Sequence, residues 1–123
     1  MLTPAQAELI YTQQISHLAR EIDNHENPSY AKFPENHAYA GDYITGIAPF
    51  ARAYGIDRSN LNKILMGHRE LSVGLFQRIA VALGDMQPHQ ICTAAILQNL
   101  SLKTFLMIDG HAINSAMQLV ASR

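Results

Sequence analysis

Five polar side chains lie within six residues near the middle of the chain, in the order Arg58, Ser59, Asn60, Asn62 and Lys63. Their guanidinium, hydroxyl, amide and ammonium groups are the donors and acceptors that distinguish base edges in the major groove of double-stranded DNA. Such side chains read bases only where a rigid element presents them together on one outer face. We therefore interpret these five residues as candidate contacts to DNA bases, provided that the surrounding sequence forms such an element.

The distribution of charge supports this interpretation. The chain of 123 residues has a formal net charge of −1, which by itself argues against a nucleic-acid binder. Residues 46–84, however, hold five Lys or Arg against two Asp or Glu, a balance of +3, whereas residues 1–45 hold two against six, a balance of −4. A basic segment beside an acidic one is the electrostatic footprint of a protein that binds nucleic acid.

The residues around the polar run satisfy the requirements of a helix-turn-helix. Two crossing helices need a small side chain where they meet, which Ala51 supplies, and then a turn residue that tolerates positive φ, which Gly55 supplies. Asp57 is a strong N-cap for the second helix. Leu61 and Ile64 would face inward and leave the polar run outside. The alternative is two ordinary helices joined by a glycine turn. That arrangement would not require all of these residue types at these positions, so the helix-turn-helix is favoured.

The same region resembles the lambda-repressor-like, XRE-type helix-turn-helix regulators. Residues 55–64 resemble the turn and recognition helix of that family, residues 67–69 its glycine-plus-basic loop, and residues 71–84 the helix that follows. The resemblance implies an all-α, five-helix DNA-binding bundle whose third helix enters the major groove, and a transcriptional repressor. Because the loop after a recognition helix runs beside the sugar-phosphate chain, we expect His68 and Arg69 to contact phosphates.

Three positions depart from the pattern of that family. Where members often have a glutamine that holds a phosphate, this chain has Ile47, so we expect Thr45 or backbone N–H groups to make that contact. A glutamate common late in the recognition helix is replaced by Leu65, and a frequent proline before Ser72 is replaced by Leu71. The first departure moves the phosphate contact, and none of the three changes the expected fold.

Apolar spacing and chain breakers divide the sequence into four parts. Residues 1–26 are predicted to form an N-terminal helix, capped by Thr3, Pro4 and Gln6. Residues 27–44 form a proline-containing loop with one helical turn around 29–33, and we expect its aromatic side chains to pack it onto the core: Tyr30, Phe33 and Tyr39. The alternative is that this loop contacts DNA or a partner. Residues 45–99 form the helix-turn-helix domain and include a further helix opening at Pro88. Residues 100–123 form a C-terminal helical extension.

We expect a homodimer that binds an inverted repeat, because one such module reads only a few base pairs. The C-terminal extension is the first choice for the interface, because it holds more apolar side chains than a small domain needs: Leu102, Phe105, Leu106, Ile113, Met117 and Val120. The alternative is that these side chains extend the core of their own chain. Residues 102–108 are ambiguous between helix and strand, and helix is favoured. The apolar stripe of residues 11–22 either packs against the domain or forms the dimer seam.

An alternative function is an antitoxin-type interaction module, which binds a partner protein such as a toxin and represses its own operon. An enzyme is not expected, because no catalytic or phosphate-loop signature is present. The six histidines form no spacing typical of a metal site, and Cys92, the only cysteine, reads as a small buried hydrophobe. We find no signal peptide and no apolar run of about 18 residues. The sequence therefore predicts a cytoplasmic protein without cofactor or metal.

Overall fold

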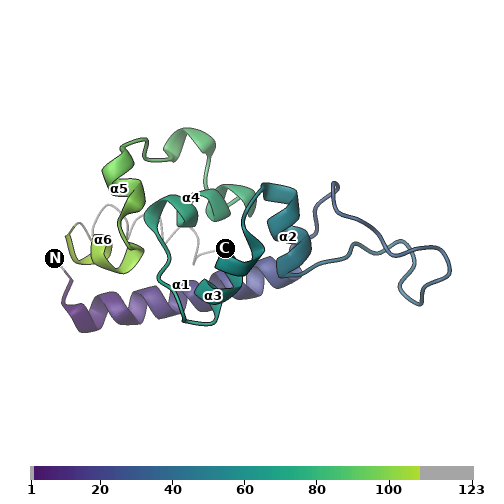
Figure 1. Cartoon of the computed structure of the whole chain (residues 1–123), viewed down its shortest axis with the longest axis horizontal. Coiled ribbons are helices and arrows are strands. Elements are labelled where there is room, and N and C mark those ends of the chain that lie inside the picture. The colour runs from purple at the N-terminus through teal and green to yellow at the C-terminus, as the bar shows by residue number, and fades with distance from the viewer. Residues whose placement is uncertain (1, 109–123) are drawn as a thin grey trace.

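The computed structural model describes residues 2–108, and within that range it contains six α-helices, one short 3₁₀ helix and no β-strand. The fold is all-α over this range, as expected. Figure 1 shows the long helix α1 running along one side of a helical body, with one irregular segment projecting from it. The elements are α1 (Pro4–Asn24), α2 (Ile47–Tyr54), α3 (Arg58–Leu65), α4 (Val73–Ala82), η1 (Pro88–Gln90), α5 (Ala95–Asn99) and α6 (Leu102–Ile108).

Helix α1 begins at the predicted capping box. The Gln6 amide donates to Thr3 Oγ1 over 3.2 Å, and the Thr3 amide donates to Gln6 Oε1 over 2.9 Å, so two otherwise unpaired N–H groups are satisfied. The apolar stripe then faces the body, where Leu18 and Ile22 are fully buried and α1 packs against α2, α3 and α6. Of the two roles that we considered for the stripe, it has the first, packing within the chain.

Helix α6 completes the core, and residues 102–108 are helical, as favoured above. Leu102 and Leu106 are fully buried beside apolar side chains of α1 and α4. Two backbone hydrogen bonds join the start of α6 to the start of α4, from the Val73 amide to the Leu100 carbonyl (2.9 Å) and from the Leu102 amide to the Leu71 carbonyl (2.7 Å).

The burial of these two leucines changes the expectation for the dimer interface. Of the two roles open to Leu102 and Leu106, pairing two copies of the chain or extending the core, they have the second, because α1 leaves an apolar face for α6 to cover. The remaining apolar residues of the extension, Ile113, Met117 and Val120, lie outside the described residues. The prediction of a helix that begins at Pro88 is also wrong.

Residues 88–94 form a single 3₁₀ turn and an extended segment, and α5 begins only at Ala95. Side chains compete here for the backbone groups that a helix would use, since Gln77 Oε1 accepts from the Cys92 amide (3.2 Å) and the Gln98 side chain donates to the Cys92 carbonyl. Gly74 permits the close approach of α5 to α4, because a Cβ atom there would lie 3.1 Å from the Gln98 carbonyl oxygen.

Residues 31–44 form a projecting hairpin, which we call the arm (Figure 1). Its two sides are joined by hydrogen bonds from the Phe33 amide to the Asp42 carbonyl (3.1 Å) and from the Ile44 amide to the Ala31 carbonyl (2.9 Å). The expected helical turn around 29–33 is absent here, because a tight turn closes instead with the Tyr30 amide donating to the Asn27 carbonyl (2.8 Å). The chain then continues extended into the hairpin.

The aromatic side chains of the loop divide between the body and the arm. Tyr30 is only 7% exposed and belongs to the core, as expected. Phe33 and Tyr39 do not join the core. Phe33 stacks on His37 with ring centroids 4.4 Å apart, and Tyr39, which is 62% exposed, lies 5.8 Å from Phe33. The expectation that all three pack against the body is therefore wrong for these two.

Candidate nucleic-acid interface

The turn between α2 and α3 has the geometry that its sequence predicts. Gly55 adopts the left-handed conformation (φ 64°, ψ 34°), and the Ile56 amide donates to the Ala51 carbonyl over 2.9 Å, which closes the end of α2. Ala51 and Ile56 are both buried, so the two helices meet closely. The turn is therefore fixed by one glycine conformation and by packing on both sides.

Arg78 on α4 braces this turn from outside. Its guanidinium Nη2 donates to the Gly55 carbonyl over 3.1 Å and to the Tyr54 carbonyl over 3.4 Å, which satisfies acceptors that the end of α2 leaves unpaired. Arg78 is one of the five Lys or Arg residues of the basic segment. Its role was missed because its partners lie 23 and 24 residues earlier in the chain, and no local pattern links them.

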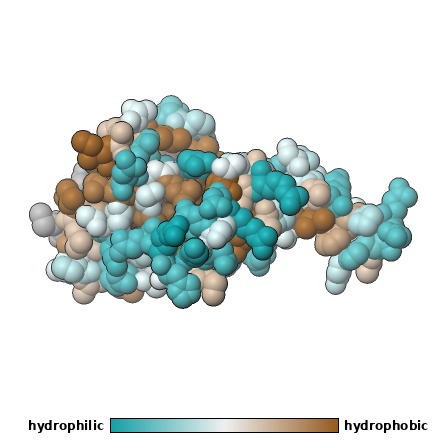
Figure 2. Space-filling model, viewed as in Figure 1, coloured by the Kyte–Doolittle hydropathy of each residue, from teal (hydrophilic) through white to brown (hydrophobic). Residues whose placement is uncertain are grey.

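Helix α3 presents most of the predicted polar run to solvent. Asp57 caps the helix by accepting from the Asn60 amide over 3.3 Å, and Leu61 and Ile64 are buried against the core. These contacts fix the rotation of the helix. Figure 2 shows hydrophilic side chains gathered over α3 and its surroundings. The exposed residues of the run are Arg58, Ser59, Asn62 and Lys63.

The fifth residue of the run, Asn60, is half-buried and pairs with a residue of the following loop. Arg69 Nη1 donates to Asn60 Oδ1. The loop brings Arg69 back towards the first turn of α3, because Gly67 takes a positive φ of 83° and the His68 amide donates to the Lys63 carbonyl over 2.8 Å. The structure therefore joins a predicted base contact to a predicted phosphate contact.

The other two predicted phosphate contacts, Thr45 and His68, are exposed. Thr45 precedes Gly46, which is the N-cap of α2 and makes no side-chain capping bond. Within residues 2–108, neither Thr45 nor His68 forms a side-chain hydrogen bond to the polar run of α3. The structure thus brings together the five predicted residues of α3 and adds Arg69 to them. Thr45 lies just before α2, and His68 lies in the loop after α3.

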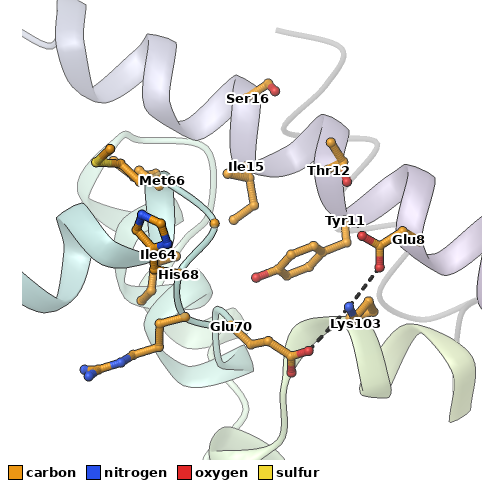
Figure 3. A pocket seen from close by; sticks show the side chains of 13 residues that line it. Glu8, Tyr11, Thr12, Ile15, Ser16, Ile64, Met66, His68, Glu70 and Lys103 are labelled. Atoms are coloured by element: carbon orange, nitrogen blue, oxygen red, sulfur yellow. Dashed lines mark hydrogen bonds and ion pairs between the residues drawn. The ribbon is translucent and has the colours of Figure 1, made fainter.

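The two carboxylates of the basic segment both have partners within the chain. Asp57 caps the helix, and Glu70 lies 3.4 Å from Lys103 Nζ, which also binds Glu8 over 2.8 Å (Figure 3). The hydrogen bond that Lys103 donates to Glu8 raises the pKa of Lys103 above its ordinary value. Arg58, Lys63 and Arg69 are the cations of α3 and of the loop that follows it.

A groove of about 480 Å³ lies between α1 and the loop that follows α3 (Figure 3). Tyr11 extends from α1 along it, and its hydroxyl oxygen accepts from the Leu71 amide over 2.8 Å. Burial is the main cause that raises the pKa of Tyr11 above its ordinary value. Tyr11 and the Lys103 bridge thus join α1 and α6 to residues 70 and 71 of the loop.

No protein-family model matches this chain, and no curated protein or solved structure is significantly similar to it. Within residues 2–108, no three His, Cys, Asp or Glu side chains lie where they could hold a metal ion. No helix in that part of the chain is both long enough and apolar enough to cross a membrane. Only the fold and the geometry of the surface described above bear on function.

Proposed function

We propose that the protein binds double-stranded DNA in a sequence-specific manner through α3 and acts in the cytoplasm as a transcriptional repressor. One observation carries the proposal. The polar side chains of α3 lie on its outer face, next to a left-handed glycine turn, on a helix whose inner face is locked into the core. A rigid helix that presents such groups is suited to insertion into the major groove. This function requires no catalytic group and no cofactor.

The side chains divide into two roles in this proposal. Arg58, in the first turn of α3, reaches the groove first and is suited to a bidentate contact with O6 and N7 of guanine. Ser59, Asn62 and Lys63 reach neighbouring base edges or the adjacent phosphates. Thr45, His68 and the uncapped N-terminus of α2 are suited to the phosphate backbone, because helix N-terminal amides attract anions.

The functional unit in this proposal is a homodimer on an inverted repeat. A single module buries little surface and discriminates few base pairs. Two copies of α3 in successive major grooves on one side of the duplex would recognise half-sites whose centres lie about 10–10.5 base pairs apart.

The test is selection of bound duplexes from a random DNA pool with the wild-type chain and with Arg58→Ala. We expect the wild type to select an inverted repeat. Arg58→Ala should lose preference at one position of each half-site and weaken binding by about 1–3 kcal/mol. Arg20→Ala is the matched control, because Arg20 is an exposed arginine of α1 outside the basic segment. Equal affinity and equal preference for wild type and Arg58→Ala would overturn the proposal.

Asn60 and Arg69 give a second prediction, because they form one unit. A phosphate contact made by Arg69 alone would weaken all DNA sequences equally when removed and would leave Asn60 independent. Held by Asn60 against the first turn of α3, Arg69 instead supports base reading. We expect Asn60→Ala and Arg69→Ala to be non-additive, with an interaction energy of about 0.5–3 kcal/mol for the selected site, measured by fluorescence anisotropy in a double-mutant cycle. Additive losses would show that the two side chains act separately.

A further inference from the structure

The arm has a defined conformation although it lies outside the helical body. Hydrogen bonds join its two sides, and Lys32 Nζ lies over the Tyr43 ring, 4.6 Å from its centroid. Residues 34–42 are all exposed, and the space-filling view shows the arm protruding from one end of the molecule (Figure 2). An ordered hairpin that buries little of its own surface is suited to contact a partner.

The chemistry of the arm points to protein rather than DNA. Phe33, His37 and Tyr39 form an aromatic cluster, and Tyr39 is mostly exposed. Aromatic side chains of this kind anchor protein interfaces. Two carboxylates, Glu35 and Asp42, accompany a single lysine in the arm, so the charge of the arm is −1 and would be repelled by phosphates.

A groove that complements the arm lies beside its base, along the outer face of α2. The groove has a volume of about 670 Å³. Small or apolar side chains of α2 form one wall, and Arg52 is the one charged residue among those of the described chain that line it. The lining residues are Ser29, Tyr30, Ala31, Ile44, Ala48, Pro49, Arg52 and Ala53. An apolar groove with one cation matches an aromatic arm with an excess of carboxylate.

We infer that the arm of one copy docks into this groove of a second copy, and that the exchange is reciprocal. The aromatic cluster would fill the apolar part of the groove, and Glu35 and Asp42 would face Arg52 of the second copy. Because each copy holds both the arm and the groove, the contact is self-complementary and closes a two-fold dimer. The inference deepens the proposed function and rests on it, since it assigns the homodimer interface to the arm and α2.

This interface has a consequence for DNA binding. The groove lies on α2, which the Gly55 turn joins directly to α3. Docking at α2 would therefore set the distance between the two copies of α3, and with it the spacing of half-sites. Residues 100–123 are the first choice for the interface from the sequence, but Leu102 and Leu106 of that stretch are already engaged within the chain.

The test is a charge-reversal exchange in the full chain, followed by sedimentation equilibrium without DNA. Glu35→Lys combined with Asp42→Lys reverses the arm, and Arg52→Glu reverses the groove. We expect each change to raise the dimer dissociation constant at least tenfold, and all three together to restore it to within a few-fold of wild type. Glu21→Lys is the matched control, because Glu21 is an exposed carboxylate of α1. Tyr39→Ala should also weaken the dimer.

Each outcome separates the interface from DNA binding. Circular dichroism checks that the variants fold, and fluorescence anisotropy measures their affinity for the selected DNA. A wild-type chain that is monomeric at tens of micromolar, or a dimer that survives Tyr39→Ala and both reversals, overturns the arm exchange without bearing on α3. Arm variants that dimerise normally but bind DNA less tightly would show that the arm contacts DNA, and would also overturn it. Unchanged affinity and preference of Arg58→Ala for DNA would overturn the proposed function but not the arm exchange, because sedimentation without DNA measures the dimer separately.

Discussion

The helical body and the arm are both ordered, but different interactions order them. In the body, side chains from α1, α2, α3, α4 and α6 are buried in one shared core. In the arm, order comes from backbone hydrogen bonds and from aromatic contacts between near neighbours, and residues 34–42 remain exposed. The body is thus held by burial, whereas the arm is held by local contacts.

This difference separates stability from recognition. Fixing the backbone costs roughly 1–2 kcal/mol per residue, and burial of apolar surface is the main term that offsets it. The body offsets this entropy within one chain. The arm buries little, so burial against another molecule, as in the proposed arm exchange, would add to the local contacts that order it. We expect substitutions in the two regions to have opposite profiles, with large effects on folding in the body and large effects on association in the arm.

The largest expected effect is on the folding of the body. Leu106 is fully buried where α6 meets α1, so Leu106→Ala should lower the free energy of unfolding by about 2–5 kcal/mol. Tyr39→Ala, in the arm, should change the free energy of unfolding of the monomer by less than about 0.5 kcal/mol. Urea denaturation followed by circular dichroism measures both values. It must be carried out at a concentration where the chain is monomeric, because dimerisation adds to apparent stability.

Equal losses for the two variants would show that the arm is part of the cooperative unit. Removal of the chain after Asn99 provides a second test of the helical body. It deletes both Leu102 and Leu106 along with the hydrogen bonds that join α6 to α4, and we expect the remainder to be largely unfolded.

The sequence predicted the local features of the body and did not predict the arm. The caps at Thr3 and Asp57 each involve an amide three residues away, so both partners are visible in a short stretch of sequence. The outer face of α3 was predictable for the same reason, because the spacing of Leu61 and Ile64 fixes which side of the helix is buried.

Contacts between distant residues could not be predicted in this way. Arg78 and Gly55 are 23 residues apart, Tyr11 and Leu71 are 60 apart, and Lys103 and Glu8 are 95 apart. Packing of the helices brings these partners together, and neither member carries a local signal for the other. The arm was missed for a related reason. Its aromatic spacing is equally compatible with packing on the core, and only the path of the chain decides between the two.

An intermediate effect is expected where α1 meets the loop after α3. The Tyr11 hydroxyl accepts the amide of Leu71, a residue that is fully buried. Tyr11→Phe removes this acceptor and leaves a buried N–H group unpaired, which should lower the free energy of unfolding by about 1–3 kcal/mol. Urea denaturation gives the value. Tyr43→Phe is the matched control in the arm, because the Tyr43 ring, rather than its hydroxyl, contacts Lys32, and the change should have little effect. A neutral Tyr11→Phe would show that water replaces the lost acceptor.

The smallest expected effect lies at Tyr30, where the arm joins the body. The ring is buried, and within residues 2–108 its hydroxyl has no hydrogen-bond partner. Removing a buried and unpaired polar group relieves its desolvation penalty, so Tyr30→Phe should be neutral or stabilising by up to about 1 kcal/mol at pH 7. This outcome is opposite in sign to that of Tyr11→Phe, although the same atom is deleted from the same type of residue.

The pH dependence of stability gives Tyr30 a second and independent test. Burial, with a smaller contribution from Tyr54, raises the pKa of Tyr30 to about 12, whereas a tyrosine in the unfolded chain has a pKa of about 10. Between these values the folded state keeps a proton that the unfolded state has released, so the unfolded state binds fewer protons and the free energy of unfolding falls as pH rises. The contribution is fully present below pH 10 and is lost as pH rises towards 12. Tyr30→Phe has no such proton to release. The difference between its free energy of unfolding and that of the wild type should therefore increase from pH 10 to pH 12, as measured by urea denaturation at a series of pH values. If the free energies of unfolding of the wild type and Tyr30→Phe differ by the same amount from pH 9 to pH 12, the Tyr30 hydroxyl reaches water. Tyr30 would then belong to the arm and not to the body.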